Sequence, residues 1–375
     1  MKQLRKAIFW AHLACGVVAG IFIFIMCVTG ALLAFEPNVL KIAESEMRSV
    51  QPPENAQRLS VREIVGKALA ARPSARPSSV TLQNDGRASA VVALGRDGQI
   101  YVDPYTGEIL GAGATRLRGF FRVVEDLHRW IALPGEARTV GKIINDVCNL
   151  AFLILALTGV YIWFPRRLAW QNFKSVMWFR GGLKGKARDF NWHNTIGFWT
   201  STALIVLTVT GAVISFQWAN NLLYTLTGNE SPAATQSPAP NQTGEQAFAL
   251  PENLDEIWKK AENQTSWKSI GLRLPIAQDS AVFTIDEGRY WNVFGRSLLI
   301  IDAKSAEVTK WESYGEQNSA RQLRSWARFT HTGETGGLIG QLIAFMACTG
   351  GAFLVFTGIS LALRRFGNWR TQKAR

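Results

Sequence analysis

The chain contains only four histidines among its 375 residues, and their positions suggest two metal-binding pairs. Neutral imidazole nitrogen is a common ligand of transition metals, and two imidazoles on facing helices can fill both axial positions of a haem iron. His12 and His193 each stand at the start of an apolar segment, whereas His128 and His331 each stand shortly before one. The pattern predicts two haem sites, one held by His12 with His193 and the other by His128 with His331.

Glycines accompany these histidines at helical spacing. Gly16 and Gly197 follow His12 and His193 by about one turn. A five-turn separation of 18 residues also recurs in or next to each of the four apolar segments, between the members of four pairs: His12 and Gly30, His193 and Gly211, Gly141 and Gly159, Gly340 and Gly358. Because glycine removes a side chain that would collide with a flat macrocycle or a close helix, we expect Gly16 and Gly197 to border a cofactor.

Four apolar segments must position these residues, and each is long enough to cross a membrane. They are 7–35, 143–164, 193–218 and 338–363. At about 1.5 Å per residue, each can span hydrocarbon that is roughly 30 Å thick. A cleaved signal peptide would also begin with basic residues and an apolar stretch, but the first segment is about twice the usual length. The sequence therefore predicts a membrane α-helical protein with a bundle of four transmembrane helices.

The net charge of +13 is unevenly distributed. The N-terminal tip, the loop at 165–190 and the tail at 364–375 together carry +14, whereas the connections 36–140 and 219–337 carry +2 and −3. Basic residues in short segments mark the cytoplasmic side of a membrane protein. We expect both termini and the 165–190 loop to be cytoplasmic, in a bacterial inner membrane, and we expect no binding to nucleic acid.

The two halves of the chain resemble each other. An offset of 181 residues aligns His12 with His193, and an offset of 199 aligns Gly141 with Gly340. Extra length in the second half falls at 231–245, a segment rich in Pro, Gln, Ala and Thr that predicts flexible coil. The sequence is therefore expected to be an internal duplication, in which each half is a helix leading out, an external domain and a helix leading back.

The long connections predict two small periplasmic α+β domains, at 36–140 and 219–335. Helical patterns occupy 58–71 and 254–264, and strand patterns occur on both sides of 103–107. The segment 103–107 reads Asp-Pro-Tyr-Thr-Gly, which is turn chemistry, whereas its counterpart 302–306 lacks the Pro, Thr and Gly. The second turn is therefore expected to be the poorer one.

Other interpretations of the histidines have to be weighed. An interfacial histidine is commonly only solvated, and glycines in membrane helices commonly mark packing. Glu125 and Glu334 each stand one turn from an outer histidine, which would suit non-haem iron or zinc, but the inner pair has no such carboxylates. None of the four cysteines lies in a C-x-x-C-H motif, so the haems would be b-type. Haem propionates need cationic partners, for which Arg129 and Arg328 are candidates.

At these residues the chain resembles the PepSY-associated transmembrane family, which includes iron-regulated inner-membrane proteins and ferric-siderophore reductases. The resemblance covers nearly the whole chain. It rests on short motifs that the sequence contains: His12 to Gly16, Thr29-Gly30-Ala31, 103–107 with the strand before it, Leu127-His128-Arg129-Trp130, Trp192-His193-Asn194 with Gly197, and His331-Thr332-Gly333-Glu334.

The resemblance implies four spans, two external PepSY domains and two haems ligated by the four histidines. It also implies outward electron transfer to a ferric siderophore or another iron chelate, with a cytoplasmic reductase or a quinol as electron donor. Two rival functions stay open at this point. One is a non-enzymatic membrane protein whose PepSY domains bind peptides or regulate a protease, and the other is a haem carrier that serves a different periplasmic acceptor.

Overall fold

A computed structural model describes residues 2–95, 98–165, 169–231, 250–276 and 280–373. The chain divides into two compact units. The helical unit comprises 1–36, 120–223 and 326–375, and the sheet unit comprises 37–119 and 224–325. The predicted coil at 231–245 falls, apart from its first residue, outside the described residues.

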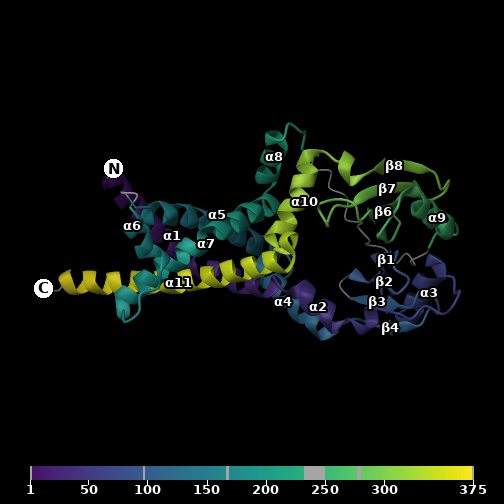
Figure 1. Ribbon diagram of the computed structural model, residues 1–375, viewed down its shortest axis with the longest axis horizontal. Helices are drawn as coiled ribbons and strands as arrows, with labels where there is room; N and C mark the ends of the chain where they lie inside the picture. The colour runs from purple at the N-terminus through teal and green to yellow at the C-terminus, as the bar shows by residue number, and fades with distance from the viewer. Residues whose placement is uncertain (1, 96–97, 166–168, 232–249, 277–279, 374–375) are drawn as a thin grey trace. The chain divides into compact units, whose positions relative to one another are not determined.

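Four long helices form the helical unit: α1 (Lys2–Leu33), α5 (Ala137–Trp163), α7 (Gly185–Ser215) and α11 (Gly337–Lys373) (Figure 1). Helix α1 packs against α5 and α11, and α7 packs against the same two helices, so α1 and α7 face each other diagonally. The apolar core between them includes Ile23, Phe152, Leu204 and Ala347. Helix α1 begins and α11 ends at the same end of this unit.

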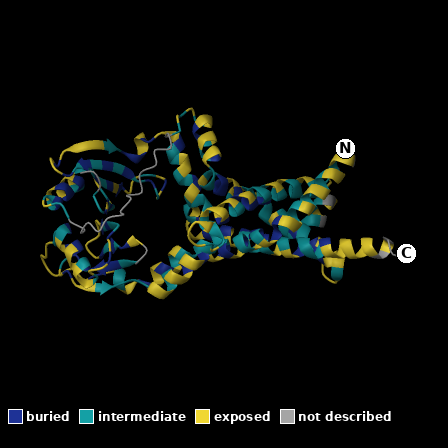
Figure 2. Ribbon diagram, turned by 180° about the vertical axis from the view of Figure 1, so that it is seen from behind, coloured by how far each residue is buried: buried dark blue, intermediate teal, exposed yellow. Residues whose placement is uncertain are grey.

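The outer surface of the bundle is apolar, as a lipid-facing surface must be. Val18 is 78% exposed and Ile339 is 72% exposed, and exposed residues occur along all four long helices (Figure 2). Such a continuous apolar surface would be unstable in water. All four helices are long and apolar enough to cross a membrane. The chain is therefore a membrane protein.

The long helices extend beyond the apolar segments that predicted them. Helix α7 begins at Gly185, so His193 lies inside the helix rather than at its start, and α11 continues through the predicted tail as far as Lys373. The predicted loop at 165–190 contains a short helix, α6 (Trp170–Met177), and the first turn of α7. Hydropathy identifies only the apolar part of each helix, which lies in the hydrocarbon. The polar ends remain helical because their backbone hydrogen bonds continue, so the helices are longer than the apolar segments.

Two helical hairpins lead into α5 and α11. Helix α4 (Thr115–Trp130) turns into α5 through Ile131 and Ala132, which both have positive φ, and α10 (Ser319–His331) turns into α11 through Gly333 and the 3-10 turn η4 (Glu334–Gly336). The structure places residues 120–140 and 326–335 with the helices, although the sequence predicted them as parts of the external domains. The boundary between the two units falls within α4 and α10, which are not apolar segments, so hydropathy does not locate it.

The sheet unit contains one antiparallel sheet of eight strands in the order β4-β3-β2-β1-β5-β6-β7-β8. The strands are β1 (Ser79–Gln83), β2 (Ala90–Ala93), β3 (Gln99–Val102), β4 (Ile109–Gly111), β5 (Ser269–Arg273), β6 (Ser280–Asp286), β7 (Ser297–Asp302) and β8 (Val308–Glu312). Helices α3 (Val61–Ala71) and α9 (Leu254–Gln264) share one hydrophobic core with strands from both connections. Shorter elements complete the chain: α2 (Glu36–Ala43), η1 (Glu46–Arg48), α8 (Gln217–Leu226) and η3 (Tyr314–Glu316).

The sequence predicted two external domains, whereas the structure joins both connections in a single sheet. Strands β1 and β5 pair antiparallel from Ser79 opposite Arg273 to Gln83 opposite Ser269. Their alternating buried and open residues place Val80 and Leu82, with Ile270 and Leu272, on the helix-covered face. Each half therefore completes its hydrophobic core with the other half.

The two predicted turns have the same construction. Asp103 accepts hydrogen bonds from the backbone of Tyr105 and Thr106, and Asp302 accepts them from Lys304 and Ser305. The position of Gly107 (φ 75°) is taken by Ala306 (φ 55°). The aspartate hydrogen bonds thus form this turn even where an alanine must adopt the left-handed conformation.

Helix α4 is anchored at its start by a buried carboxylate. Glu44 is fully buried and accepts hydrogen bonds from Arg118, Arg48, Tyr101 and the backbone of Ala114. Desolvation alone would raise the pKa of Glu44, but these hydrogen bonds, chiefly that of Arg118, lower the pKa to about 2. The side chain is therefore ionised at neutral pH and ties Arg118, in the first turn of α4, to the segment after α2.

Candidate functional site: two histidine pairs

His12 and His193 lie at the end of the helical unit where α1 begins and α11 ends, and we call them the termini-end pair. They project from α1 and α7, which face each other diagonally. The Nδ1 atom of His12 lies 2.8 Å from Oγ1 of Thr158 on α5, and that of His193 lies 2.9 Å from Oγ1 of Thr357 on α11.

His128 and His331 lie near the ends of α4 and α10, and we call them the hairpin-end pair. Their ring centres are 6.3 Å apart and their planes are inclined by 51°. Nδ1 of His128 lies 2.9 Å from Oγ1 of Thr29 on α1, and Nδ1 of His331 lies 2.9 Å from the Leu207 carbonyl oxygen and 3.3 Å from Oγ1 of Thr210 on α7. The structure thus brings His128 and His331 together, and it places His12 and His193 on the two diagonal helices near the opposite end of the bundle.

Burial keeps the hairpin-end rings neutral. It lowers the pKa of His128 to about 4, helped by the neighbouring His331, and it also lowers the pKa of His331. Both rings therefore carry an unprotonated nitrogen at neutral pH, which is the form that binds metals.

A glycine follows each of the four threonines and lies against the imidazole that the threonine contacts. A Cβ added to Gly30 would lie 3.3 Å from Cε1 of His128, and one added to Gly211 would lie 3.0 Å from Cε1 of His331. The corresponding distances at the termini end are 3.5 Å from Gly159 to His12 and 3.4 Å from Gly358 to His193. The sequence pattern paired Gly30 and Gly211 with the histidine of their own helix, and Gly159 and Gly358 with another glycine. In the structure each of the four accommodates a histidine from another element.

The other two glycines of the five-turn pattern hold the hairpins closed. A Cβ at Gly141 would overlap the carbonyl oxygen of Trp130, and a Cβ at Gly340 would overlap that of Gly333. Each of these carbonyls belongs to the second residue after a hairpin-end histidine. The close approach of backbone to glycine therefore fixes where α4 and α10 end.

Gly16 and Gly197 have a different environment. A Cβ at Gly16 would lie 3.7 Å from Leu155, and one at Gly197 would lie 3.6 Å from Leu354. Both distances are ordinary van der Waals contacts, so the protein's own packing leaves room for a methyl group at either position.

The two predicted cationic residues are held at the surface beside the hairpin-end pair. Arg129 is 54% exposed, forms an ion pair with Glu125 at 2.7 Å and stacks on Trp130 at 4.2 Å. Arg328 lies over the ring of Phe329 at 5.7 Å. Contact of either residue with a haem propionate stays a prediction.

The carboxylates that favoured non-haem iron or zinc are turned to other partners. Glu125 pairs with Arg129, and Glu334 accepts a hydrogen bond from Thr332. In the described part of the chain, no group of three or more His, Cys, Asp or Glu side chains gathers closely enough to hold a metal ion. At the hairpin-end pair, neither Glu125 nor Glu334 gathers with the histidines as such a site requires.

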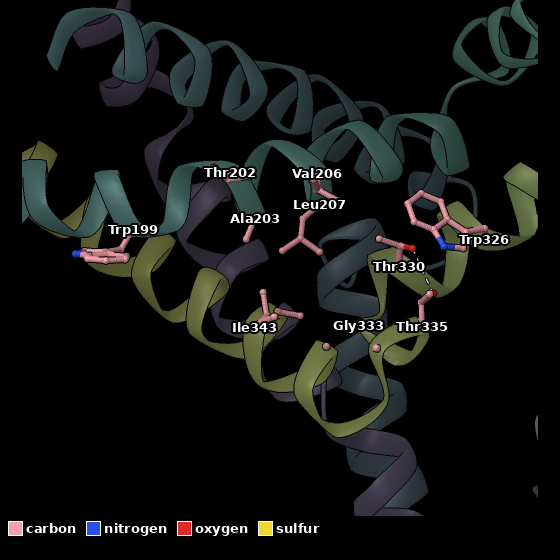
Figure 3. A pocket seen from close by; sticks show the side chains of 13 residues that line it. Trp199, Thr202, Ala203, Val206, Leu207, Trp326, Thr330, Gly333, Thr335 and Ile343 are labelled. Carbon is pink, nitrogen blue, oxygen red and sulfur yellow. Dashed lines mark hydrogen bonds between the residues drawn. The ribbon is translucent and has the colours of Figure 1, made fainter. Parts of the chain in front are cut away.

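An apolar groove of about 450 Å³ runs along the outside of the bundle between α7 and α11, next to the α10 hairpin (Figure 3). Trp199 and Trp326 lie at its two ends, and Ala203 and Leu207 line it between them. The Leu207 carbonyl accepts the hydrogen bond of His331, so the groove reaches the helical turn that supports this histidine.

Sequence reasoning missed the four threonines that contact the imidazoles. The signal was present, because all four apolar segments contain a Thr-Gly dipeptide, at 29–30, 158–159, 210–211 and 357–358, although the last segment contains a second one at 349–350. Only the first and third were noticed, as part of the repeat. The hydrogen bonds to histidines of other elements depend on tertiary structure, so spacing within one helix does not reveal them.

The fold and the paired histidines define a polytopic helical membrane protein with two like sites. The family of the PepSY-associated TM region matches residues 9–365, nearly the whole length of the chain. This protein therefore belongs to the PepSY-associated transmembrane family, as its motifs predicted. A search of curated proteins gave no significant match.

Proposed function

We propose that this protein carries two b-type haems and transfers electrons across a bacterial inner membrane to a periplasmic ferric chelate. One haem would be held by His12 and His193, and the other by His128 and His331. The observation that carries the proposal is the recurrence of one arrangement at four places: an imidazole whose Nδ1 contacts a threonine and whose edge lies against the next glycine.

The spacing of the hairpin-end rings supports haem ligation. Two imidazoles bound to opposite sides of one metal, each at about 2 Å, place their ring centres roughly 6 Å apart. The 6.3 Å between His128 and His331 matches this requirement. At the termini end, His12 and His193 come from diagonal helices and so face each other across the bundle.

The glycines beside the termini-end pair support a planar group there. Because a methyl group at Gly16 or Gly197 would make only ordinary contacts with the protein, helix packing alone does not require glycine at these positions. A macrocycle ligated by His12 and His193, one turn away, would need the space that a side chain would take.

Bound haem supplies one-electron chemistry whose potential is set by axial ligands and burial. The chain's four histidines would hold the two groups near opposite ends of one bundle. Siderophores bind Fe(III) more tightly than Fe(II), so reduction of the chelate by one electron would release the metal. The positive-inside pattern supports a periplasmic location for the sheet unit, where the chelate would bind, and the matching halves support a duplication.

The electron donor would be a cytoplasmic reductase or a membrane quinol. Either donor would reduce the haem of the termini-end pair, which the positive-inside pattern assigns to the cytoplasmic side.

Haem content tests the proposal directly. The purified protein, expressed with ample haem, should contain two haems per chain by a pyridine haemochrome assay. His12→Ala and His193→Ala should each remove the same haem and leave about half of the Soret absorbance, whereas His128→Ala and His331→Ala should remove the other. Asn194→Ala, beside His193, is the matched control and should retain both haems.

The acceptor needs a second measurement. Protein reduced with dithionite should be reoxidised faster by ferric hydroxamates than by copper complexes or periplasmic oxidoreductases. A protein without a Soret band would instead favour a peptide-binding or regulatory PepSY protein, and equal reoxidation by all acceptors would favour a general electron carrier.

A further inference from the structure

The four threonines that contact the histidines share a second hydrogen bond. Each Oγ1 lies close to the backbone carbonyl oxygen four residues earlier in its own helix. The distances are 2.6 Å for Thr29 to Ile25, 2.6 Å for Thr158 to Ile154, 2.7 Å for Thr210 to Val206 and 2.8 Å for Thr357 to Phe353. A hydroxyl has one proton, and a carbonyl oxygen can only accept. The threonine proton is therefore committed to its own helix.

A hydroxyl whose proton is committed can only accept from the imidazole. The proton between Thr158 and His12 must then belong to Nδ1 of the histidine, and the same holds at the other three threonines. His331 gives independent support, because its Nδ1 also lies 2.9 Å from the Leu207 carbonyl oxygen, which has no proton to give.

We propose that Thr29, Thr158, Thr210 and Thr357 are positioning residues that hold the four histidines in the Nδ1-protonated tautomer. A neutral imidazole protonated at Nδ1 has its free electron pair on Nε2, which is then the atom offered to a metal. In the described part of the chain, every side-chain hydrogen bond of the four rings is made by Nδ1. That metal would be the haem iron, so the binding of Nε2 to it rests on the proposed function. The tautomer itself does not require haem.

The following glycine completes the arrangement. It lets the Cε1 edge of each ring lie against the helix backbone, so the ring is fixed at two points, Nδ1 and Cε1. Each ligand is thereby oriented by a helix other than its own. Helix α1 carries His12 near one end and Thr29 near the other, and α7 carries His193 and Thr210 in the same way. These two helices therefore serve both sites.

Hydrogen bonds of this kind have a measurable effect on metal sites. A partner of the distal ring nitrogen fixes ring orientation and raises ligand basicity, and its removal typically weakens metal binding by about 10–100-fold. Thr158→Val keeps the shape of the side chain but removes the acceptor, whereas Thr158→Ser keeps the acceptor. Thr200→Val is the matched control, because Thr200 bonds to the Ile196 carbonyl in the same way, and no hydrogen bond to a histidine is found for it in the described residues.

The test uses the full-length protein with ¹⁵N-labelled histidine and has two readouts. Without haem, the ring nitrogens of all four histidines should show protonated Nδ1, and Thr158→Val should change this signal for His12 alone. With haem, Thr158→Val should weaken haem binding at the termini end by about 10–100-fold. Thr158→Ser and Thr200→Val should stay within about threefold of the parent protein.

The outcomes separate this inference from the proposed function. Protonated Nε2 in the parent protein, or a Thr158→Val protein with unchanged tautomer and haem affinity, would overturn it. A parent protein that binds no haem would refute the proposed function, and the tautomers measured without haem would still decide this inference.

Discussion

The two histidine pairs make the same contacts but are placed by different means. The termini-end histidines belong to α1 and α7, so the long helices themselves hold them. The hairpin-end histidines belong to α4 and α10, separate helices, and contact the bundle at Thr29 and Leu207. One site is therefore a property of the bundle, whereas the other depends on two hairpins and on the segments before them. Changes that displace a hairpin should affect the second site alone.

The largest effect is expected from closing the space between a hairpin and its long helix. In Gly141→Ala the added methyl group would overlap the Trp130 carbonyl, which is rigid backbone, so α4 must move and His128 with it. We expect loss of the hairpin-end haem and retention of the termini-end haem, seen as about half of the Soret absorbance.

The control for this substitution lies in α4 itself. A Cβ at Gly119 would have no neighbour within 4 Å, so Gly119→Ala should retain both haems. If Gly141→Ala lost both haems together, the two sites would not be independent, and the contrast between bundle and hairpin would be wrong.

A smaller effect is expected where α4 is anchored in the sheet unit. Glu44→Gln leaves Arg118 and Arg48 without their buried carboxylate, which should lower stability by roughly 3 kcal/mol at pH 7. Arg321 occupies the corresponding position in α10, ten residues before His331, just as Arg118 is ten residues before His128. Arg321 pairs with Glu312 at the surface, where the two side chains are 43% and 20% exposed. Glu312→Gln should therefore cost no more than about 1 kcal/mol.

The stabilisation that Glu44 provides should depend on pH. Folding lowers the pKa of Glu44 from 4.5 to about 2, so its contribution is complete above pH 4.5 and is lost as the pH falls toward 2. The difference in Tm between the parent protein and Glu44→Gln should shrink over this range. A difference that stayed constant between pH 7 and pH 2 would contradict an ionised Glu44 in the folded protein.

The sequence predicted those parts of the molecule that depend on local pattern. Four apolar runs predicted the four long helices, and the Asp-Pro-Tyr-Thr-Gly segment predicted the turn before β4. The histidine pairing followed from the side of the membrane on which each ring must lie. It could be predicted because the choice was among only four residues.

Features that depend on tertiary pairing were not predictable in the same way. Strands β1, β5 and β6 went unrecognised, because the β1–β5 pair that joins the two halves consists of short segments with polar residues on one face. The threonine contacts were missed for a related reason, since each hydrogen bond crosses from one element to another. Both features become visible only when the two halves are assembled.

The smallest effect should separate the two pairs by the fit of their glycines. A Cβ at Gly211 would lie 3.0 Å from His331, closer than side chains normally pack, whereas one at Gly159 would lie 3.5 Å from His12, an ordinary contact. Gly211→Ala should therefore displace the ring at a cost of about 1 kcal/mol, the low end for overpacking, and Gly159→Ala should cost less. Haem titration of both variants should show weakening of about fivefold at the hairpin end, as about 1 kcal/mol implies, and little change at the termini end. Equal weakening by both substitutions would mean that the two glycines fit their imidazoles equally closely, and the hairpin end would lose its distinction as the more tightly packed site.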